Sequence, residues 1–143
     1  MIISHKHKFI FVKTKKTGGT SFEIALSKIC GPNDILTPIR KQDEVARKAY
    51  ADISAQNFYL PWKYYTKANL LRYLAKKKKL PLRYYPHIGC QDLRPLIPKE
   101  VWNGYYKFTL ERNPFDKVVS LYYWRGGDKK FGSLYRFISG GGL

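Results

Sequence analysis

The chain has 143 residues, a length typical of one domain, and its 44% hydrophobic content is that of a globular protein. Its formal net charge of +17 predicts polyanionic partners: a nucleotide, a nucleic acid, an acidic glycan or membrane headgroups. Two cysteines, Cys30 and Cys90, are too few and too far apart for a disulfide framework or a metal site, which predicts free buried thiols. No apolar run approaches the ~20 residues of a transmembrane helix, and the N-terminus lacks a signal-peptide layout, so we expect a cytoplasmic protein.

The first predicted unit is a strand, a basic loop and a helix within Phe9 to Leu26, FIFVKTKKTGGTSFEIAL. Residues 8–13 contain four consecutive apolar side chains, which predicts a buried strand of the parallel type. Thr20 or Ser21 is expected to cap the helix that follows, and Gly31-Pro32-Asn33 to end it. Many proteins hold a phosphate with a strand, a loop and a helix in this order, because the helix N-terminus attracts anions.

The loop between this strand and helix is rich in groups that bind anions. Glycines let backbone N–H groups turn toward a ligand, lysines add charge and hydroxyls add donors. The residues concerned are Lys15, Lys16, Thr17, Gly18, Gly19, Thr20 and Ser21. Lys16 precedes both glycines, whereas a GxxxxGK[ST] loop places its lysine after the second glycine, so an ATP or GTP loop of that kind is not predicted. A GxGxxG dinucleotide motif is also absent.

The middle of the chain predicts mainly helices and loops. We expect residues 33–40 to be irregular, 42–54 to form a polar helix, and 56–65, which contain Pro61, to form an aromatic loop. Residues 66–79 predict a helix that ends in four lysines, which we interpret as a solvated C-terminus favoured by the helix dipole. Short helical turns are expected at 92–96 and 98–102.

The second predicted unit is again a strand followed by a helix. Residues 105–111 form the expected strand, and Asn113 caps a helix that begins at Pro114 and runs to Gly126-Gly127. Arg112 ends the strand, where open α/β sheets bind ligands, and Ser120 lies two turns along the helix, so both side chains are candidates to share one anion. A further helix begins at residue 134. Two strand–helix units around a helical middle predict a layered α/β fold.

Three stretches of this sequence resemble a known family. IFVKTKKTGGTSFE resembles the 5′-phosphosulfate loop of sulfotransferases, often seen as FVHIPKTGGTS, and KFTLERNPFDKVVSLYYW resembles their 3′-phosphate segment, often seen as FKFAFVRNPWDRLVSLY. Between them, HIGCQDLRPLIPKEVWNGYYKF resembles the family's lead-in to its second strand. The family is that of the Golgi-type carbohydrate sulfotransferases, sulfotransferase family 2. The resemblance covers roughly residues 8–31 and 87–125, whereas residues 32–86 are not diagnostic.

The resemblance implies a fold and a co-substrate. The expected fold is a P-loop-like three-layer α/β fold, a central parallel sheet flanked by helices, in a single domain of residues 1–143. The co-substrate would be 3′-phosphoadenosine 5′-phosphosulfate, with the loop residues from Lys15 to Ser21 around its phosphosulfate and with Arg112 and Ser120 on its 3′-phosphate. The implied reaction is sulfuryl transfer to a hydroxyl of an acceptor, a carbohydrate by family analogy.

The residue types fit this chemistry. Sulfuryl transfer resembles phosphoryl transfer in its loose, in-line transition state, so positioning and charge stabilisation dominate, and Lys16 can neutralise charge on the leaving phosphate oxygen. No metal is predicted, because no cluster of metal ligands is present in the sequence. His87, which matches the histidine of the family's lead-in, is the candidate general base, with Asp92 and Glu111 as alternatives. His5 and His7 precede the first predicted strand and are expected at the surface.

The chain departs from the family pattern in two respects. Lys13 and Lys15 stand where the family often has histidine and proline; without the proline, a more mobile loop is expected, and the role of Lys13 is open. The chain also ends soon after the second motif, in GGGL, which leads us to expect a C-terminally truncated domain.

A second class of function remains open on the sequence. Lysines interleaved with Tyr84, Tyr85 and the aromatic residues of 62–65 suit a nucleic-acid-binding module, in which aromatics stack on bases and lysines neutralise phosphates. No established nucleic-acid recognition motif is present, so this remains the alternative. The oligomeric state is left open.

Overall fold

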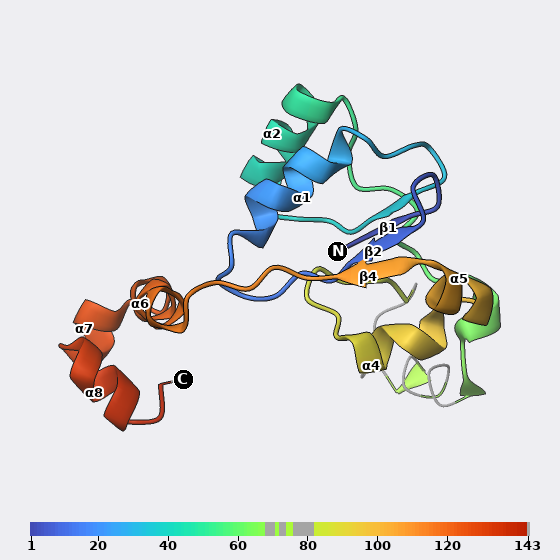
Figure 1. Cartoon of the computed structure of the whole chain (residues 1–143). Helices are drawn as coiled ribbons and strands as arrows, with labels where there is room; N and C mark the ends of the chain where they lie inside the picture. Colours follow the sequence, from blue (N-terminus) through green and yellow to red (C-terminus); the bar gives the residue numbers. More distant parts are fainter. Residues whose placement is uncertain (68–70, 72–73, 76–81, 143) are drawn as a thin grey trace. The chain divides into compact units, whose positions relative to one another are not determined.

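The computed structural model describes residues 1–67, 71, 74–75 and 82–142 (Figure 1). The chain divides into two compact units: unit 1 contains residues 1–13 and 20–109, and unit 2 contains residues 14–19 and 110–143. The expectation of a single domain over 1–143 stays a prediction.

Unit 1 is built on a four-stranded mixed sheet with the order β3-β1-β2-β4. Strand β1 (Ile2–Ser4) pairs antiparallel with β2 (Phe9–Phe11) and with β3 (Ile35–Leu36), whereas β2 pairs parallel with β4 (Tyr106–Phe108). The α/β class expected from the sequence is confirmed. A central parallel sheet is not confirmed, since the parallel pairing among the described strands is that of β2 with β4.

The helices of unit 1 lie on both sides of this sheet. Figure 1 shows α1 (Gly19–Ser27) and α2 (Lys41–Ala51) on one side of the strands, and α4 (Cys90–Leu93) and α5 (Lys99–Gly104) on the other. Two 3₁₀ turns complete the unit, η1 (Trp62–Tyr64) and η2 (Arg94–Leu96).

The alternation of side chains along β2 explains why both faces are covered. Phe11 contacts Phe22 of α1 and Phe108 of β4, with ring centroids 5.3 and 5.4 Å apart. The next side chain, Ile10, points to the opposite face, as successive residues of a strand do, and joins the main apolar cluster with Ile3 and Leu93. Aromatic packing therefore holds one face of the sheet, and aliphatic packing dominates the other.

Several boundaries and two strands differ from the sequence expectations. The expected strands at 8–13 and 105–111 and the helix at 42–54 are present with shorter bounds. Residues 2–4 and 35–36, for which no strand was predicted, form β1 and β3, because strands of two or three residues carry no readable periodicity. Helix α1 begins at Gly19, so Thr20 and Ser21 lie in its first turn and are not its N-cap.

Two other middle segments need separate mention. The loop expected at 56–65 contains η1 and two isolated bridges, Leu36 with Gln56 and Tyr59 with Arg83. The helix expected at 66–79 falls largely outside the described residues. The turn expected at 98–102 is present as the start of α5.

Unit 2 contains the loop 14–19 and three short packed helices, α6 (Pro114–Trp124), α7 (Gly127–Phe131) and α8 (Leu134–Ser139). The predicted cap is confirmed: the Asn113 side-chain oxygen accepts a hydrogen bond from the Phe115 N–H at 3.0 Å. Phe137 packs against Tyr122 and Phe131, with ring centroids 5.6 and 5.0 Å apart. A Cβ on Gly127 would lie 2.3 Å from the Tyr122 ring, so only glycine allows α6 and α7 to pack this closely.

A buried carboxylate connects four segments of unit 1. Glu23 of α1 is fully buried, and its oxygens lie 2.9 Å from the Met1 amine, 3.0 Å from Lys13 Nζ and 3.1 Å from Arg47 Nη2 of α2. Burial lowers the pKa of the Met1 amine to about 6, although Glu23 acts in the opposite direction. The structure thereby assigns a partner to Lys13: its ammonium pairs with Glu23.

Candidate anion-binding site

The loop 14–19 has a backbone of alternating handedness. Lys16 and Gly18 have positive φ angles of 62° and 75°, whereas Thr17 between them does not. Successive residues of opposite hand make their N–H groups converge on a concave surface that binds anions. Gly18 adopts this conformation without steric cost, while Lys16 carries backbone strain of the kind that clusters at functional sites.

The hydroxyl groups at the start of the loop support it internally. Thr17 is buried, and its Oγ1 lies 3.0 Å from Thr14 Oγ1. The Thr14 hydroxyl donates a hydrogen bond to the backbone oxygen of Leu110 at 2.8 Å. The loop is thus tied, within unit 2, to the segment that leads into α6.

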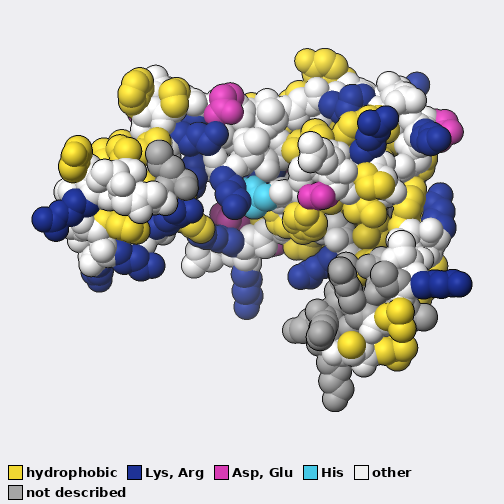
Figure 2. Space-filling model, turned by 90° about the horizontal axis from the view of Figure 1, so that it is seen from below, with side chains coloured by type: hydrophobic (Ala, Val, Ile, Leu, Met, Phe, Trp, Pro, Cys, Tyr) yellow, Lys and Arg dark blue, Asp and Glu magenta, His cyan; other side chains and the backbone are white. Residues whose placement is uncertain are grey.

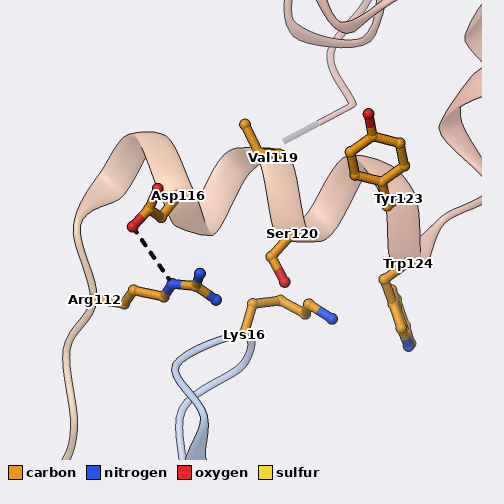
Figure 3. Close-up of a pocket in the computed structure, with 7 residues that line it drawn as sticks. All are labelled: Lys16, Arg112, Asp116, Val119, Ser120, Tyr123 and Trp124. Atoms are coloured by element: carbon orange, nitrogen blue, oxygen red, sulfur yellow. Dashed lines mark ion pairs between the residues drawn. The ribbon is translucent and has the colours of Figure 1, made fainter.

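A pocket of about 490 Å³ lies between this loop and helix α6, entirely within unit 2 (Figure 3). It is lined by Lys16, Arg112, Asp116, Val119, Ser120, Tyr123 and Trp124. Figure 3 shows the Arg112 guanidinium and the Lys16 side chain below Ser120, with the Lys16 amine directed toward Trp124. The structure therefore brings together three residues that were predicted from two segments almost a hundred positions apart in the sequence.

Charge in this pocket is mainly positive. The single carboxylate among its lining residues, Asp116 Oδ2, lies 3.9 Å from Arg112 Nε, and Figure 3 shows the rest of the guanidinium directed toward Ser120. Lys16 Nζ lies 5.6 Å from the centre of the Trp124 ring, a cation–π contact. The partners that these two cations have among the described residues are partly exposed and weak, which leaves both cations able to bind an anion.

The remaining residues of the predicted loop surround this backbone turn. Lys15 and Gly18 are exposed, and Gly19 is the buried first residue of α1. Thr20 is half-buried and Ser21 is exposed in the first turn of α1, both within unit 1.

Glu111, an alternative base, is already engaged. It accepts hydrogen bonds from the Arg112 backbone N–H and from Lys117 Nζ, both at 3.0 Å. These two bonds, the backbone one being the stronger influence, lower the pKa of Glu111. A lower pKa makes this carboxylate a weaker proton acceptor at neutral pH.

His87, the candidate base, lies in unit 1 on the exposed turn before α4. Its Nδ1 lies 3.1 Å from the backbone oxygen of Lys13. A carbonyl oxygen only accepts, so Nδ1 is the donor in this contact. The other alternative, Asp92, accepts a long hydrogen bond of 3.4 Å from Tyr85.

The two N-terminal histidines lie in the turn between β1 and β2. His7 is exposed, as expected, and its Nε2 lies 2.9 Å from the Ile29 backbone oxygen. His5 is half-buried, because its Nδ1 meets the Tyr105 hydroxyl at 2.8 Å.

Sequence reasoning did not single out four of the lining residues: Asp116, Val119, Tyr123 and Trp124. A spacing of four residues on a helix places side chains on one face. Starting from Ser120, this rule leads directly to Asp116 and Trp124, so the helical period was the signal that could have found them.

Basic side chains also dominate the molecular surface beyond the pocket. Figure 2 shows many lysine and arginine side chains on the face that it presents, and few acidic ones. The described residues contain no group of three or more histidine, cysteine, aspartate or glutamate side chains that could hold a metal ion. They also contain no helix with the length and apolar character required to cross a membrane.

Comparisons of the chain with protein-family models, with curated proteins and with solved structures find no match. The site is therefore interpreted from its own geometry and from the motifs in the sequence.

Proposed function

We propose that this protein is a sulfotransferase that uses 3′-phosphoadenosine 5′-phosphosulfate to transfer a sulfuryl group to an acceptor hydroxyl, on a carbohydrate by family analogy. The observation that carries the proposal is the shared pocket of Lys16, Arg112 and Ser120. The two motifs that resemble the phosphosulfate loop and the 3′-phosphate segment supply these three side chains.

The proposal divides the pocket between two phosphate groups. The loop N–H groups and Lys16 bind the 5′-phosphosulfate, and Arg112 with Ser120 binds the 3′-phosphate. A guanidinium suits a phosphate, since its planar N–H groups donate in pairs. Recognition of a 3′-phosphate distinguishes this co-substrate from ATP, which has none.

The proposed reaction exchanges one sulfur–oxygen bond for another. The bond from sulfur to the bridging oxygen of the 5′-phosphate breaks, and a bond from sulfur to the acceptor oxygen forms. Lys16 neutralises the charge that develops on the leaving phosphate oxygen. By family analogy, the acceptor's proton passes to His87, which matches the histidine of the family's lead-in.

A P-loop-like three-layer fold belongs to the same proposal. Three features support it: the parallel pairing of β2 with β4, the helices on both sides of the sheet of unit 1, and a helix that follows each of these two strands in the sequence. The carboxyl ends of the two parallel strands lead into the loop 14–19 and into α6, as expected for a ligand site of an open α/β sheet.

The test is calorimetric titration with adenosine 3′,5′-bisphosphate, the product that remains after sulfuryl transfer. We expect Arg112→Ala to weaken binding by at least about tenfold, the typical value of a lost charge-assisted hydrogen bond. Lys16→Ala should weaken it similarly, and Lys16→Gly serves as a second variant because glycine tolerates the positive φ. Lys99→Ala, an exposed lysine on α5, is the charge-matched control and should bind as the unmodified chain does.

A second ligand isolates the role of Arg112. Adenosine 5′-monophosphate differs from the bisphosphate only in lacking the 3′-phosphate, so we expect it to bind more weakly than the bisphosphate, and Arg112→Ala to abolish the difference. Equal affinity for the two nucleotides in the unmodified chain would contradict the proposal.

Nucleic-acid binding is the second candidate, and exposed aromatic side chains favour it. Trp62 is 76% exposed and Tyr59 is 54% exposed, and Lys63 lies beside them in the sequence. If this candidate is right, a single-stranded oligonucleotide binds with an affinity that falls steeply with salt, while bisphosphate binding is undetectable in the folded protein.

A further inference from the structure

We infer that Lys13 and Glu23 are positioning residues: their buried ion pair holds the two ends of the anion-binding loop at a fixed separation. This inference rests on the proposed function for its ligand but on unit 1 alone for its geometry. Lys13 is the last residue before the chain leaves unit 1, and Glu23 lies in the first turns of α1, soon after the chain returns at Thr20. Lys13 Nζ and Glu23 Oε2 are 3.0 Å apart.

The contact between Lys13 and Glu23 is shielded from solvent on both sides. The Lys13 side chain is 6% exposed and Glu23 is fully buried. Water therefore competes little for either charge. Removal of Glu23 would leave the Lys13 ammonium buried without its partner, whereas removal of Lys13 would leave Glu23 paired with the Met1 amine and Arg47. The Lys13 ammonium is consequently committed to the protein, and it is not a further cation for the ligand.

The backbone of Lys13 is fixed as well. His87 Nδ1 donates to the Lys13 carbonyl oxygen at 3.1 Å, and the backbone N–H of Val12 donates to Phe108 of β4 at 2.9 Å. Both the side chain and the main chain thus define the point at which the loop begins.

A loop with a strained backbone needs ends that are fixed in this way. Lys16 keeps a positive φ only while the surrounding structure outweighs the steric cost of this conformation. Because only six residues connect the two ends, a shift of either end would be transmitted to the N–H groups of the loop. Loss of the Lys13–Glu23 contact should therefore change the loop before it unfolds unit 1.

Arg47 provides a matched control. Its Nη2 lies 3.1 Å from the other oxygen of Glu23, and it is fully buried, as Lys13 nearly is. It sits on α2, which is not adjacent to the loop in the sequence. Lys13→Met and Arg47→Met each remove one buried cation from Glu23, but only the first one removes the contact at the loop's end.

Two measurements test the inference. Hydrogen exchange of the amides of residues 14–19 needs no ligand: we expect it to accelerate at least about tenfold in Lys13→Met and to be unchanged in Arg47→Met. The affinity for adenosine 3′,5′-bisphosphate should fall about tenfold in Lys13→Met and less than about twofold in Arg47→Met, and Lys13→Arg, which keeps the ion pair, should restore both values. If Lys13→Met does not fold, Lys13→Gln replaces it, since the amide removes the charge but keeps a polar side chain at this position.

The outcomes separate this inference from the proposed function. Equal effects of Lys13→Met and Arg47→Met on loop exchange would overturn the positioning role, whatever ligand binds. Absence of bisphosphate binding in the unmodified chain would contradict the proposed function, while faster loop exchange in Lys13→Met alone would still support the positioning role.

Discussion

At the scale of single residues, the anion-binding loop depends on backbone conformation as much as on charge. Lys16 and Gly18 both lie in the left-handed region, but only Gly18 does so without a steric penalty. Side-chain substitutions in this loop therefore change the backbone energy as well as the contacts. Their interpretation requires controls that separate these two effects.

We predict opposite effects of the same substitution at two glycines. Gly18→Ala should lower the free energy of unfolding by about 1 kcal/mol, because an L-residue is strained at a φ of 75°. Gly104→Ala should raise it by up to about 1 kcal/mol, because Gly104 is helical and a Cβ there meets nothing within 4 Å. Urea denaturation of the two variants measures both values. Destabilisation of equal size at the two positions would rule out this explanation.

The two cysteines should differ strongly in reactivity. Burial raises the pKa of the Cys30 thiol to about 12, and the nearby Asp34 carboxylate adds to the effect, whereas Cys90 is exposed. Since the thiolate is the reactive form, we expect a disulfide reagent at pH 8 to modify Cys90 at least about a hundredfold faster than Cys30.

The modification should therefore have a fast phase from Cys90 and a slow phase from Cys30, and single-cysteine variants identify each phase. Cys90→Ser should remove the fast phase, Cys30→Ser should keep it, and both thiols should react rapidly in denaturant. A fast phase that survives in Cys90→Ser would show that Cys30 is accessible. The structure thus corrects the sequence expectation of two buried thiols: one is half-buried and the other is exposed.

At the scale of elements, a second buried carboxylate connects the β1–β2 turn with the segment after α1. Asp34 accepts hydrogen bonds from the Ser4 hydroxyl at 2.9 Å and from the backbone N–H groups of His5, Lys6 and Gly31 at 2.7, 3.1 and 2.8 Å. Burial acts to raise the pKa of Asp34, but these four bonds outweigh it and lower the pKa. The carboxylate therefore stabilises the fold in its ionised form.

This lowered pKa predicts the pH dependence of an Asp34→Asn variant. The contribution of Asp34 is fully present above the ordinary aspartate pKa of 3.8 and is lost as the pH falls through the lower value in the folded protein. At pH 7 the variant should be less stable by about 2 kcal/mol, and the difference should shrink in acid. Denaturation at pH 7 and in acid measures this, with Asp92→Asn, at an exposed aspartate, as control. A difference that is the same in acid would contradict the prediction.

At the scale of the whole molecule, charge has two different roles. The formal net charge of +17 acts at the surface, where it favours polyanionic partners but does not select among them. Inside unit 1, cations are instead paired around Glu23, which joins the start of β1, the end of β2, α1 and α2. Burial of this cluster ties the stability of unit 1 to one carboxylate.

Glu23→Gln should therefore destabilise unit 1 strongly. Lys13, Arg47 and the Met1 amine would lose their shared negative charge in a buried site, for which the typical cost is about 3–5 kcal/mol. Thermal or urea denaturation measures the loss, and Glu100→Gln, on an exposed residue of α5, is the control. A loss no larger than that of the control would show that the ion pairs are dispensable.

The sequence by itself determined the features that depend on neighbouring residues. The apolar run before the loop, the Asn113-Pro114 start of α6 and the glycines at its end are encoded within a few positions, so the strand, the cap and the helix could be predicted. The same local reading identified Lys16, Arg112 and Ser120 as candidates, since each stands at a strand–helix junction or on the helix that follows.

The tertiary structure alone decided the features that depend on distant residues. Pairing of β1 with β3 forms strands that are too short to show a pattern in the sequence. Burial of Glu23 against β1 and α2 makes it the partner of Lys13, which the sequence left without an assigned role. Helix α6 adds Val119 and Tyr123, which the four-residue spacing from Ser120 does not predict, to the pocket only through packing beside the loop. The physical reason is that burial and ion pairing are set by which segments meet in space, whereas caps, turns and periodicity are set along the chain.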